Sequence, residues 1–263
     1  MQAFWSVLRL SFRQQLTYRT ALLAGLATNL FFAMLRTAVL TALYAGQPSV
    51  NGLQFSEAIT YVAFTQGIIA FVALFNWTDL MQTVYSGSIA ADLLKPIRFF
   101  TLWMAREAGR ALVNLAARGV LLMACFALLY PLLLPPGRQH RLALPFTLIF
   151  AWLVSFVWRF LVNLSAFWTP DARGIMRLSM ILMQLFSGFF MPLRLLPDWF
   201  SRLCAYTPFP AMINTPVEVF LGKVSGAALL QALTWQFLWF LALWLLAEVV
   251  LRLGLRKLVI QGG

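Results

Sequence analysis

Apolar residues in this chain are grouped into six long stretches, separated by short polar connections. The stretches are continuous and show no alternation of apolar and polar positions. A helix of roughly 20 apolar residues crosses the hydrocarbon core of a bilayer, and an uninterrupted apolar run is typical of a helix rather than of a barrel strand. The pattern therefore predicts six transmembrane helices. Their expected ranges are 20–44, 58–78, 111–134, 142–168, 178–193 and 227–247.

The composition agrees with a membrane protein. The chain is 62% hydrophobic and 11% charged, and its mean hydropathy is +0.82. A soluble domain of 263 residues cannot hide that much apolar surface, whereas a bilayer covers it. We therefore expect an all-α polytopic membrane protein, with residues 1–263 forming a single transmembrane domain.

The basic residues favour one orientation in the membrane, because cytoplasmic loops carry an excess of Lys and Arg. The richer set is Arg9, Arg13, Arg19, Lys95, Arg98, Arg106, Arg110, Arg173, Arg177, Arg252, Arg256 and Lys257. The poorer set is Arg138, Arg141, Arg194, Arg202 and Lys223. We expect the richer side and both termini to be cytoplasmic, in a bacterial inner (plasma) membrane. The net charge of +12 borders the spans, so lipid head groups rather than nucleic acid are the expected neighbours.

Residues 1–19 are expected to form an amphipathic helix. One face carries Trp5, Leu8, Phe12 and Leu16, and another carries Ser6, Arg9, Arg13 and Thr17. Aromatic residues opposite arginines favour a helix that lies in the membrane interface. A plain cytoplasmic extension of the first span is the alternative.

The longest cytoplasmic connection is the segment 79–110. Gly87 and Ser88 are expected to break the helix that leaves the second span, with Ser88 capping a new short helix. Pro96 ends that helix, because a residue before proline is disfavoured in the helical region. Its apolar side chains are Ile89, Leu93 and Leu94. The residues alone fit a docking helix for another protein and a linker packed on the chain's own spans equally well.

An outer segment, 194–225, follows the fifth span and is rich in proline and aromatic residues. Pro192 and Pro197 are expected to end the fifth span early, and Asp198 to cap the helix that follows. We expect this segment to dip into or lie on the outer leaflet, covered by other helices, because uncovered irregular backbone is not tolerated at membrane depth.

Several of these features together resemble the permease subunit of a type-2 ABC exporter. The resemblance rests on the block from Gly87 to Pro96, on the series Gly188, Pro192, Leu196-Pro197, Trp199 and Pro208, and on the six spans and the N-terminal helix. It implies a coupling helix that seats in a separate ATPase, with Ile89, Ala90, Asp92, Leu93, Leu94 and Lys95 as its residues. It also implies a re-entrant outer hairpin over 197–210, marked by Pro192, Pro197, Trp199, Tyr206 and Pro208. The implied partners are two copies of the ATPase and a second permease, identical or related.

The chain lacks the G-x-x-x-x-G-K-[ST] phosphate loop, so it cannot hydrolyse ATP by that route. ATP and Mg²⁺ would be bound by the partner, and this chain is expected to be no enzyme. The two cysteines and the single histidine do not have metal-ligand spacing, so no metal site is expected.

Four ionisable residues fall inside the predicted spans: Arg36, Arg118, Arg159 and Glu248. An ion pair between Arg36 and Glu57 is expected at the outer face, and Glu248 is a candidate partner of Arg118 or Arg159. Such groups are costly in a membrane and suggest a function, here a basic lining for an anionic or zwitterionic amphiphile. The alternative is arginines that reach lipid phosphates or fix helix packing.

Two other kinds of membrane protein stay open from the sequence. A secondary transporter would usually show internal repeats and a buried acidic relay. Neither a clear repeat nor a carboxylate in the middle of a span is present. A membrane assembly or scaffold protein without an ATPase partner is the other alternative.

Overall fold

The computed structural model describes residues 2–75 and 77–257. Met1 of the predicted interfacial helix, Asn76 of the predicted second span and residues 258–263 of the predicted domain lie outside the described residues. Helices dominate the fold, and the described strands form one short hairpin, β1 (Ser49–Val50) with β2 (Leu53–Gln54). The α-helices are α1 (Gln2–Thr17), α2 (Arg19–Leu43), α3 (Phe55–Ile68), α4 (Asp79–Tyr85), α5 (Ile89–Leu93), α6 (Phe99–Asn114), α7 (Leu121–Leu129), α8 (Arg138–Leu164), α9 (Arg173–Phe186), α10 (Asp198–Ala205), α11 (Asn214–Phe220) and α12 (Gly226–Leu255). The remaining turns are the π-helical η1 (Leu115–Val120) and the 3₁₀ turns η2 (Ser165–Phe167), η3 (Leu193–Leu195) and η4 (Pro210–Met212).

Four helical stretches are long and apolar enough to cross a membrane. They are Arg19–Leu43, Phe99–Leu129, Arg138–Phe167 and Gly226–Leu255, and they match the first, third, fourth and sixth predicted spans. The expectation of an all-α membrane protein is confirmed. The other two predicted spans form shorter helices, since α3 and α9 have 14 residues each.

The second predicted span is not one continuous helix, because α3 ends at Ile68 and an irregular stretch leads to α4. Side chains of α8 satisfy the freed backbone of this stretch. The Ser155 hydroxyl donates to the Val72 carbonyl at 2.5 Å, and the Asn163 amide donates to the Trp77 carbonyl at 2.9 Å. Irregular backbone at membrane depth is tolerated where protein covers it, and α8 supplies that cover.

Helix α8 is the centre of the packing. It lies against α12 and α11 along much of its length, and α9 also contacts it. Its aromatic residues Phe156 and Phe160 are buried against Phe100 of α6. Lipid tails are as apolar as these side chains, so close packing and buried polar contacts hold the helices together. The buried Gln236 side chain of α12 is one such contact, since its amide donates to two carbonyls and accepts from Thr147.

The N-terminal helix α1 packs on α6. The Ser11 hydroxyl donates to the Arg106 carbonyl at 2.6 Å, and Gly109 lets the two backbones approach closely. Ser11 is the buried residue of α1, whereas Trp5 and Leu16 of the predicted apolar face are exposed. Exposed apolar residues on a helix that also carries arginines still suit a membrane interface.

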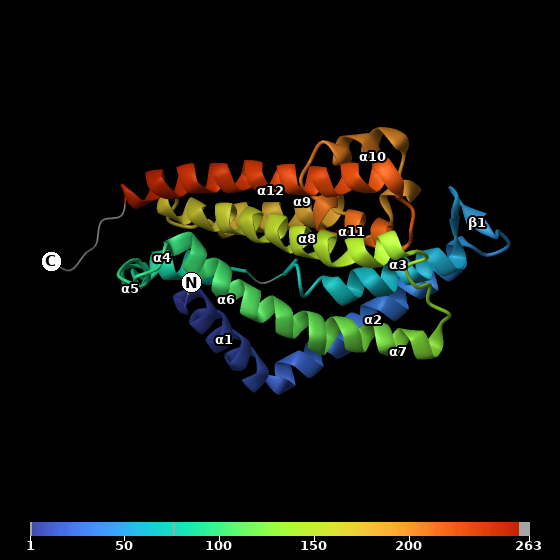
Figure 1. Ribbon diagram of the computed structural model, residues 1–263, viewed down its shortest axis with the longest axis horizontal. Helices are drawn as coiled ribbons and strands as arrows, with labels where there is room; N and C mark the ends of the chain where they lie inside the picture. The colour runs from blue at the N-terminus through green and yellow to red at the C-terminus, as the bar shows by residue number, and fades with distance from the viewer. Residues whose placement is uncertain (1, 76, 258–263) are drawn as a thin grey trace.

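The two ends of the molecule differ. Figure 1 shows the start of α1, α4, α5 and the end of α12 at one end of the long axis. The β1–β2 hairpin lies at the opposite end. The segments that were predicted to share the cytoplasmic side therefore lie together.

The outer segment forms η3, α10, η4 and α11. Asp198 is the first residue of α10, and the capping position before it is Pro197, so the predicted cap by Asp198 is wrong. Trp199 and Tyr206 are 65% and 83% exposed. Both side chains therefore face outwards, while Cys204 of the same helix is buried.

Candidate functional site

The predicted coupling element is built from α4, a sharp turn and α5. Gly87 has a φ of +72°, a conformation that favours glycine, and this turn separates the two helices. Helix α5 ends at Leu93, one residue before the predicted end. Ser88 occupies its N-cap position but makes no side-chain cap hydrogen bond, so the predicted cap is wrong. Its hydroxyl instead lies 2.8 Å from that of Ser86.

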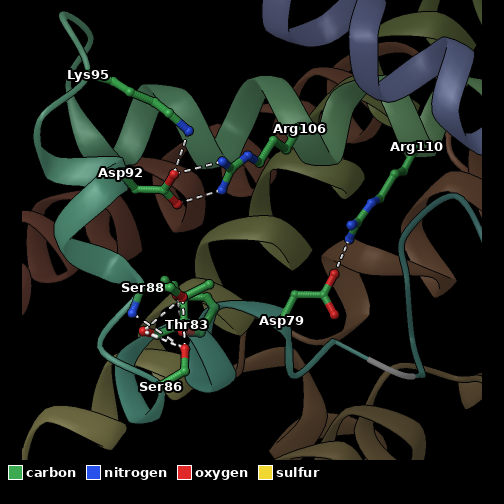
Figure 2. A network of polar contacts seen from close by, with 9 residues as sticks. Asp79, Thr83, Ser86, Ser88, Asp92, Lys95, Arg106 and Arg110 are labelled. Carbon is green, nitrogen blue, oxygen red and sulfur yellow. Dashed lines mark hydrogen bonds and ion pairs between the residues drawn. The ribbon is translucent and has the colours of Figure 1, made fainter.

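The α5 helix is anchored to the protein by Asp92. Its carboxylate accepts hydrogen bonds of 2.6 and 2.8 Å from the Arg106 guanidinium on α6, and one of 2.7 Å from Lys95 (Figure 2). The Asp92 side chain is 7% exposed. Burial alone would raise the pKa of this carboxyl, but the hydrogen bonds and positive charges of Arg106 and Lys95 outweigh it and hold the pKa below its ordinary value.

The residues of α5 divide into an inner and an outer set. Ile89 is fully buried and Asp92 is almost fully buried, and both hold the helix in place. Leu93 and Leu94 point the other way, and Leu94 is 87% exposed. Ala90 is half-buried and Lys95 is exposed. A leucine this exposed, at the end of the molecule that holds the start of α1 and the end of α12, is a candidate contact for a partner.

A chain of charged groups continues from this element into the helix bundle. Arg110 of α6 pairs with Asp79 at the start of α4 and with Glu107, and Glu107 pairs with Arg159 of α8 at 2.8 Å. Arg159 is 3% exposed. A small cavity of about 30 Å³ lies among these groups, also lined by Trp77 and Trp103, and the Arg159 Nη2 beside it has no hydrogen-bond partner among the described residues. A space of this size and polarity fits about one water molecule.

Two predicted ion pairs are wrong. Glu248 pairs with Arg98 at 3.3 Å, and neither Arg118 nor Arg159 reaches it. Glu57 pairs with Lys223 at 2.6 Å. The Glu57 carboxylate also accepts a hydrogen bond from the Gln54 backbone amide at the start of α3, and it makes no ion pair with Arg36.

Arg36 and Arg118 border a second, larger cavity of about 970 Å³ between α2, α3, α6 and α9. The Arg36 guanidinium donates to the Phe189 carbonyl and lies 3.9 Å from the centre of that phenyl ring. The Arg118 guanidinium donates to the Gly25 carbonyl and to the Asn29 side chain, each at 3.1 Å. Arg118 belongs to η1, a π-helical turn, and such turns are frequent at functional sites.

The outer segment is tied to α3 by a buried polar cluster. The Tyr61 hydroxyl donates to the Gly188 carbonyl at 2.8 Å and lies 3.2 Å from the Asn214 side-chain oxygen. Pro192 and Pro197 flank η3 between these residues and α10. Pro208 leads into η4, which packs on α8.

Residues 29–262 match the family described as ABC-2 family transporter protein. The match covers far more than half of the 263 residues. This chain belongs to the ABC-2 transporter family. No curated protein sequence matches it at a significant level.

Family membership confirms the resemblance read from the sequence. An ABC-2 protein is a membrane component of an ABC transporter, which works with an ABC ATPase. The chain is therefore a transport permease, and the secondary transporter and the scaffold without an ATPase are not supported.

Several residues of this ABC-2 protein that organise the site were not expected from the sequence. Arg106 and Glu107 are adjacent on α6, yet one anchors α5 and the other reaches α8. Asn163 and Gln66 are also buried at key positions. The sequence shows that Arg106 and Glu107 are charged neighbours. It does not show that Arg106 pairs with Asp92, 14 residues away, or that Glu107 pairs with Arg159, 52 residues away.

Proposed function

We propose that this chain is the membrane-spanning subunit of an ATP-driven exporter, and that α5 transmits the movement of a separate ATPase to the helix bundle. The observation that carries the proposal is the exposure of the Leu94 side chain. This side chain is 87% exposed directly after a short helix that the Asp92–Arg106 ion pair anchors to α6. Burying a leucine contributes roughly 1.5–3 kcal/mol, so a groove on a partner would gain from covering it.

The geometry supports a mechanical path from the ATPase to the bundle. A push on Leu93 and Leu94 moves α5, and Asp92 passes the movement to Arg106 of α6. Glu107, the next residue of α6, is bound to Arg159 of α8. Because α6 and α8 belong to stretches long enough to cross a membrane, the displacement of α5 is converted into a tilt of two membrane helices.

The proposed assembly contains two ATPases and a second permease, identical or related. The proposed topology has six crossings, with both termini and α5 on the cytoplasmic side of a bacterial inner membrane. The common position of the start of α1, the end of α12 and α5 at one end of the molecule supports an even number of crossings (Figure 1). In this topology, α3 with the irregular stretch and α4 makes one crossing, and α9 makes another.

The proposed outer hairpin is re-entrant and consists of η3, α10 and η4. Its exposed aromatic residues Trp199 and Tyr206 would lie at the level of the lipid head groups, where such side chains are favoured. The Tyr61–Gly188 hydrogen bond supports it from within, since it ties the entry of the hairpin to α3.

The experiment is co-purification of the cognate ATPase with Leu94→Asp in the full complex. The substitution removes apolar burial and would place a carboxylate in the groove, so the ATPase affinity should fall about tenfold or more. Leu134→Asp is the matched control, since Leu134 is also exposed (78%) but lies in the connection from α7 to α8. Equal ATPase recovery with both variants would refute the coupling role of α5.

A further inference from the structure

The large cavity of about 970 Å³ carries positive charge that no carboxylate balances. Arg36 and Arg118 line it, and neither makes an ion pair with any acidic residue among those that the structure describes. Their hydrogen bonds go to carbonyl oxygens and to the neutral Asn29. A partly buried guanidinium without a counter-ion is costly, so this pair of arginines favours an anion.

The one carboxylate on the cavity lining does not change this balance. Glu107 is bound to both Arg110 and Arg159, and Arg110 is also bound to Asp79. These two arginines and two carboxylates neutralise one another. Two uncompensated charges are left, those of Arg36 and Arg118.

Polar atoms around Arg118 also lack partners within the described part of the chain. Both amide atoms of the Gln66 side chain, which is 1% exposed, make no hydrogen bond, and neither does the Arg118 Nε. The Asn114 side-chain oxygen is unpaired as well. These atoms are themselves buried, so they make the wall beside the Arg118 guanidinium polar.

Part of the remaining wall is apolar, while Gln15, Thr28 and Gln184 add neutral polar groups. Its lining includes Phe32, Leu35, Phe75 and Phe190, all of them exposed. Along α2 the lining runs from Ala21 to Arg36, which is about 22 Å at the rise of an α-helix. A long cavity with apolar walls and two charged positions matches a molecule with an acyl chain and a charged head.

We propose that this cavity binds an amphiphile with an anionic head group, which Arg118 and Arg36 hold while the apolar wall covers its chain. The assignment of this ligand as the cargo of the transporter rests on the function proposed above. The chemistry selected is a phosphate, sulfate or carboxylate group. The Arg118 guanidinium lines the cavity and can donate hydrogen bonds to its oxygens, and charge-assisted bonds of this kind are the strong ones.

The test is native mass spectrometry of the full chain in a non-ionic detergent, titrated with three probes. The probes are phosphatidylglycerol, phosphatidylcholine with the same acyl chains, and inorganic phosphate. Phosphatidylglycerol should bind about tenfold or more tightly than phosphatidylcholine, and inorganic phosphate alone should bind weakly because it lacks the chain. Equal binding of the two lipids would overturn the anionic selectivity, and tight binding of free phosphate would overturn the amphiphile.

Variants separate the cavity from lipids bound elsewhere. Arg36→Gln and Arg118→Gln should each reduce phosphatidylglycerol binding about tenfold, while Arg36→Lys retains most of it. The control Arg252→Gln removes one exposed charge at the end of α12 and should bind as the unaltered chain does. Because Arg118 also holds Asn29, the Tm of each variant is measured as well, and Arg36→Gln and Arg118→Gln should weaken binding without a matching loss of Tm. If none of the cavity variants differs from Arg252→Gln, the site is wrong.

The outcome is independent of the coupling experiment. The titration needs no ATPase, and Leu94→Asp should bind phosphatidylglycerol as the unaltered chain does. A failure of lipid binding with normal ATPase recovery would refute this inference alone. Normal lipid binding with equal ATPase recovery for Leu94→Asp and Leu134→Asp would refute the coupling role alone.

Discussion

Asp92 and Arg106 are joined by two hydrogen bonds across 14 residues of the chain, and this pair holds α5 against α6. Removing the carboxylate charge should release α5. We expect Asp92→Asn to destabilise the docked helix by about 2–3 kcal/mol, which is typical of hydrogen bonds to charged groups. Limited proteolysis of the segment 86–98 measures this release, because a detached α5 is cleaved faster.

The matched control for Asp92→Asn is Asp171→Asn. Asp171 also pairs with an arginine, Arg173, but both side chains are more than half exposed. Exposed pairs contribute little, so the control should leave proteolysis of 86–98 unchanged. Equal cleavage of both variants would show that Asp92 does not anchor α5.

The anchoring of α5 should depend on pH only in the acid range. The pKa of Asp92 is lowered in the folded protein, so its contribution is complete above the ordinary pKa of about 3.9 and is lost as the pH falls through the lowered value. Proteolysis of 86–98 should therefore be the same at pH 7 and pH 5 and increase below about pH 4. Asp92→Asn should lack this acid step, and an unaltered step in that variant would assign it to another group.

The contact between α1 and α6 depends on Gly109. A Cβ atom there would lie 2.5 Å from the Leu8 carbonyl oxygen and 2.8 Å from the Phe12 nitrogen, both backbone atoms that cannot move alone. Gly109→Ala should force α1 away and lower the stability by about 1–3 kcal/mol, as overpacking does. The measurement is the Tm of the purified chain.

Gly174→Ala on α9 provides the comparison, because nothing lies within 4 Å of the added methyl group. Alanine is the better helix former, so this Tm should stay the same or rise. A Tm for Gly109→Ala equal to that of Gly174→Ala would mean that α1 does not pack on α6 as described.

Asn163 should be essential for the irregular backbone between α3 and α4. Its amide donates to the Trp77 carbonyl, and its oxygen accepts from the Met81 amide at 3.0 Å. Asn163→Leu leaves these backbone groups unpaired at about 1–3 kcal/mol each, so the Tm should fall clearly. Gln231→Leu, an exposed change on α12, should not change it. A Tm loss shared by both variants would indicate a general effect of the leucine.

The sequence predicted most of the fold because long apolar runs have one stable form in a bilayer. It failed at the second span, where residues 68–75 are as apolar as a helix requires. The carbonyl groups of Val72 and Trp77 in this region are instead paired with Ser155 and Asn163, which lie more than 80 residues away. The hydropathy pattern contains no trace of such a pairing.

The site was predicted in part for the same reason. Gly87 and Pro96 mark the ends of a short helix locally, and the exposure of Leu94 agrees with the expected coupling face. The burial of Ile89 and Asp92 depends on α6, and the true partner of Glu248 is Arg98 on a distant segment. Charges in the spans were recognised, but their pairs are set by tertiary contacts.

Docking of α5 into an ATPase can be observed by cross-linking. Leu94→Cys in an otherwise cysteine-free full complex should form a cross-link to a cysteine placed in the groove of the cognate ATPase, with Leu134→Cys as the control. Docking predicts a cross-linked product for position 94 that changes in yield when ATP is added, and none for position 134. No product at position 94 in an assembled, transporting complex would contradict it.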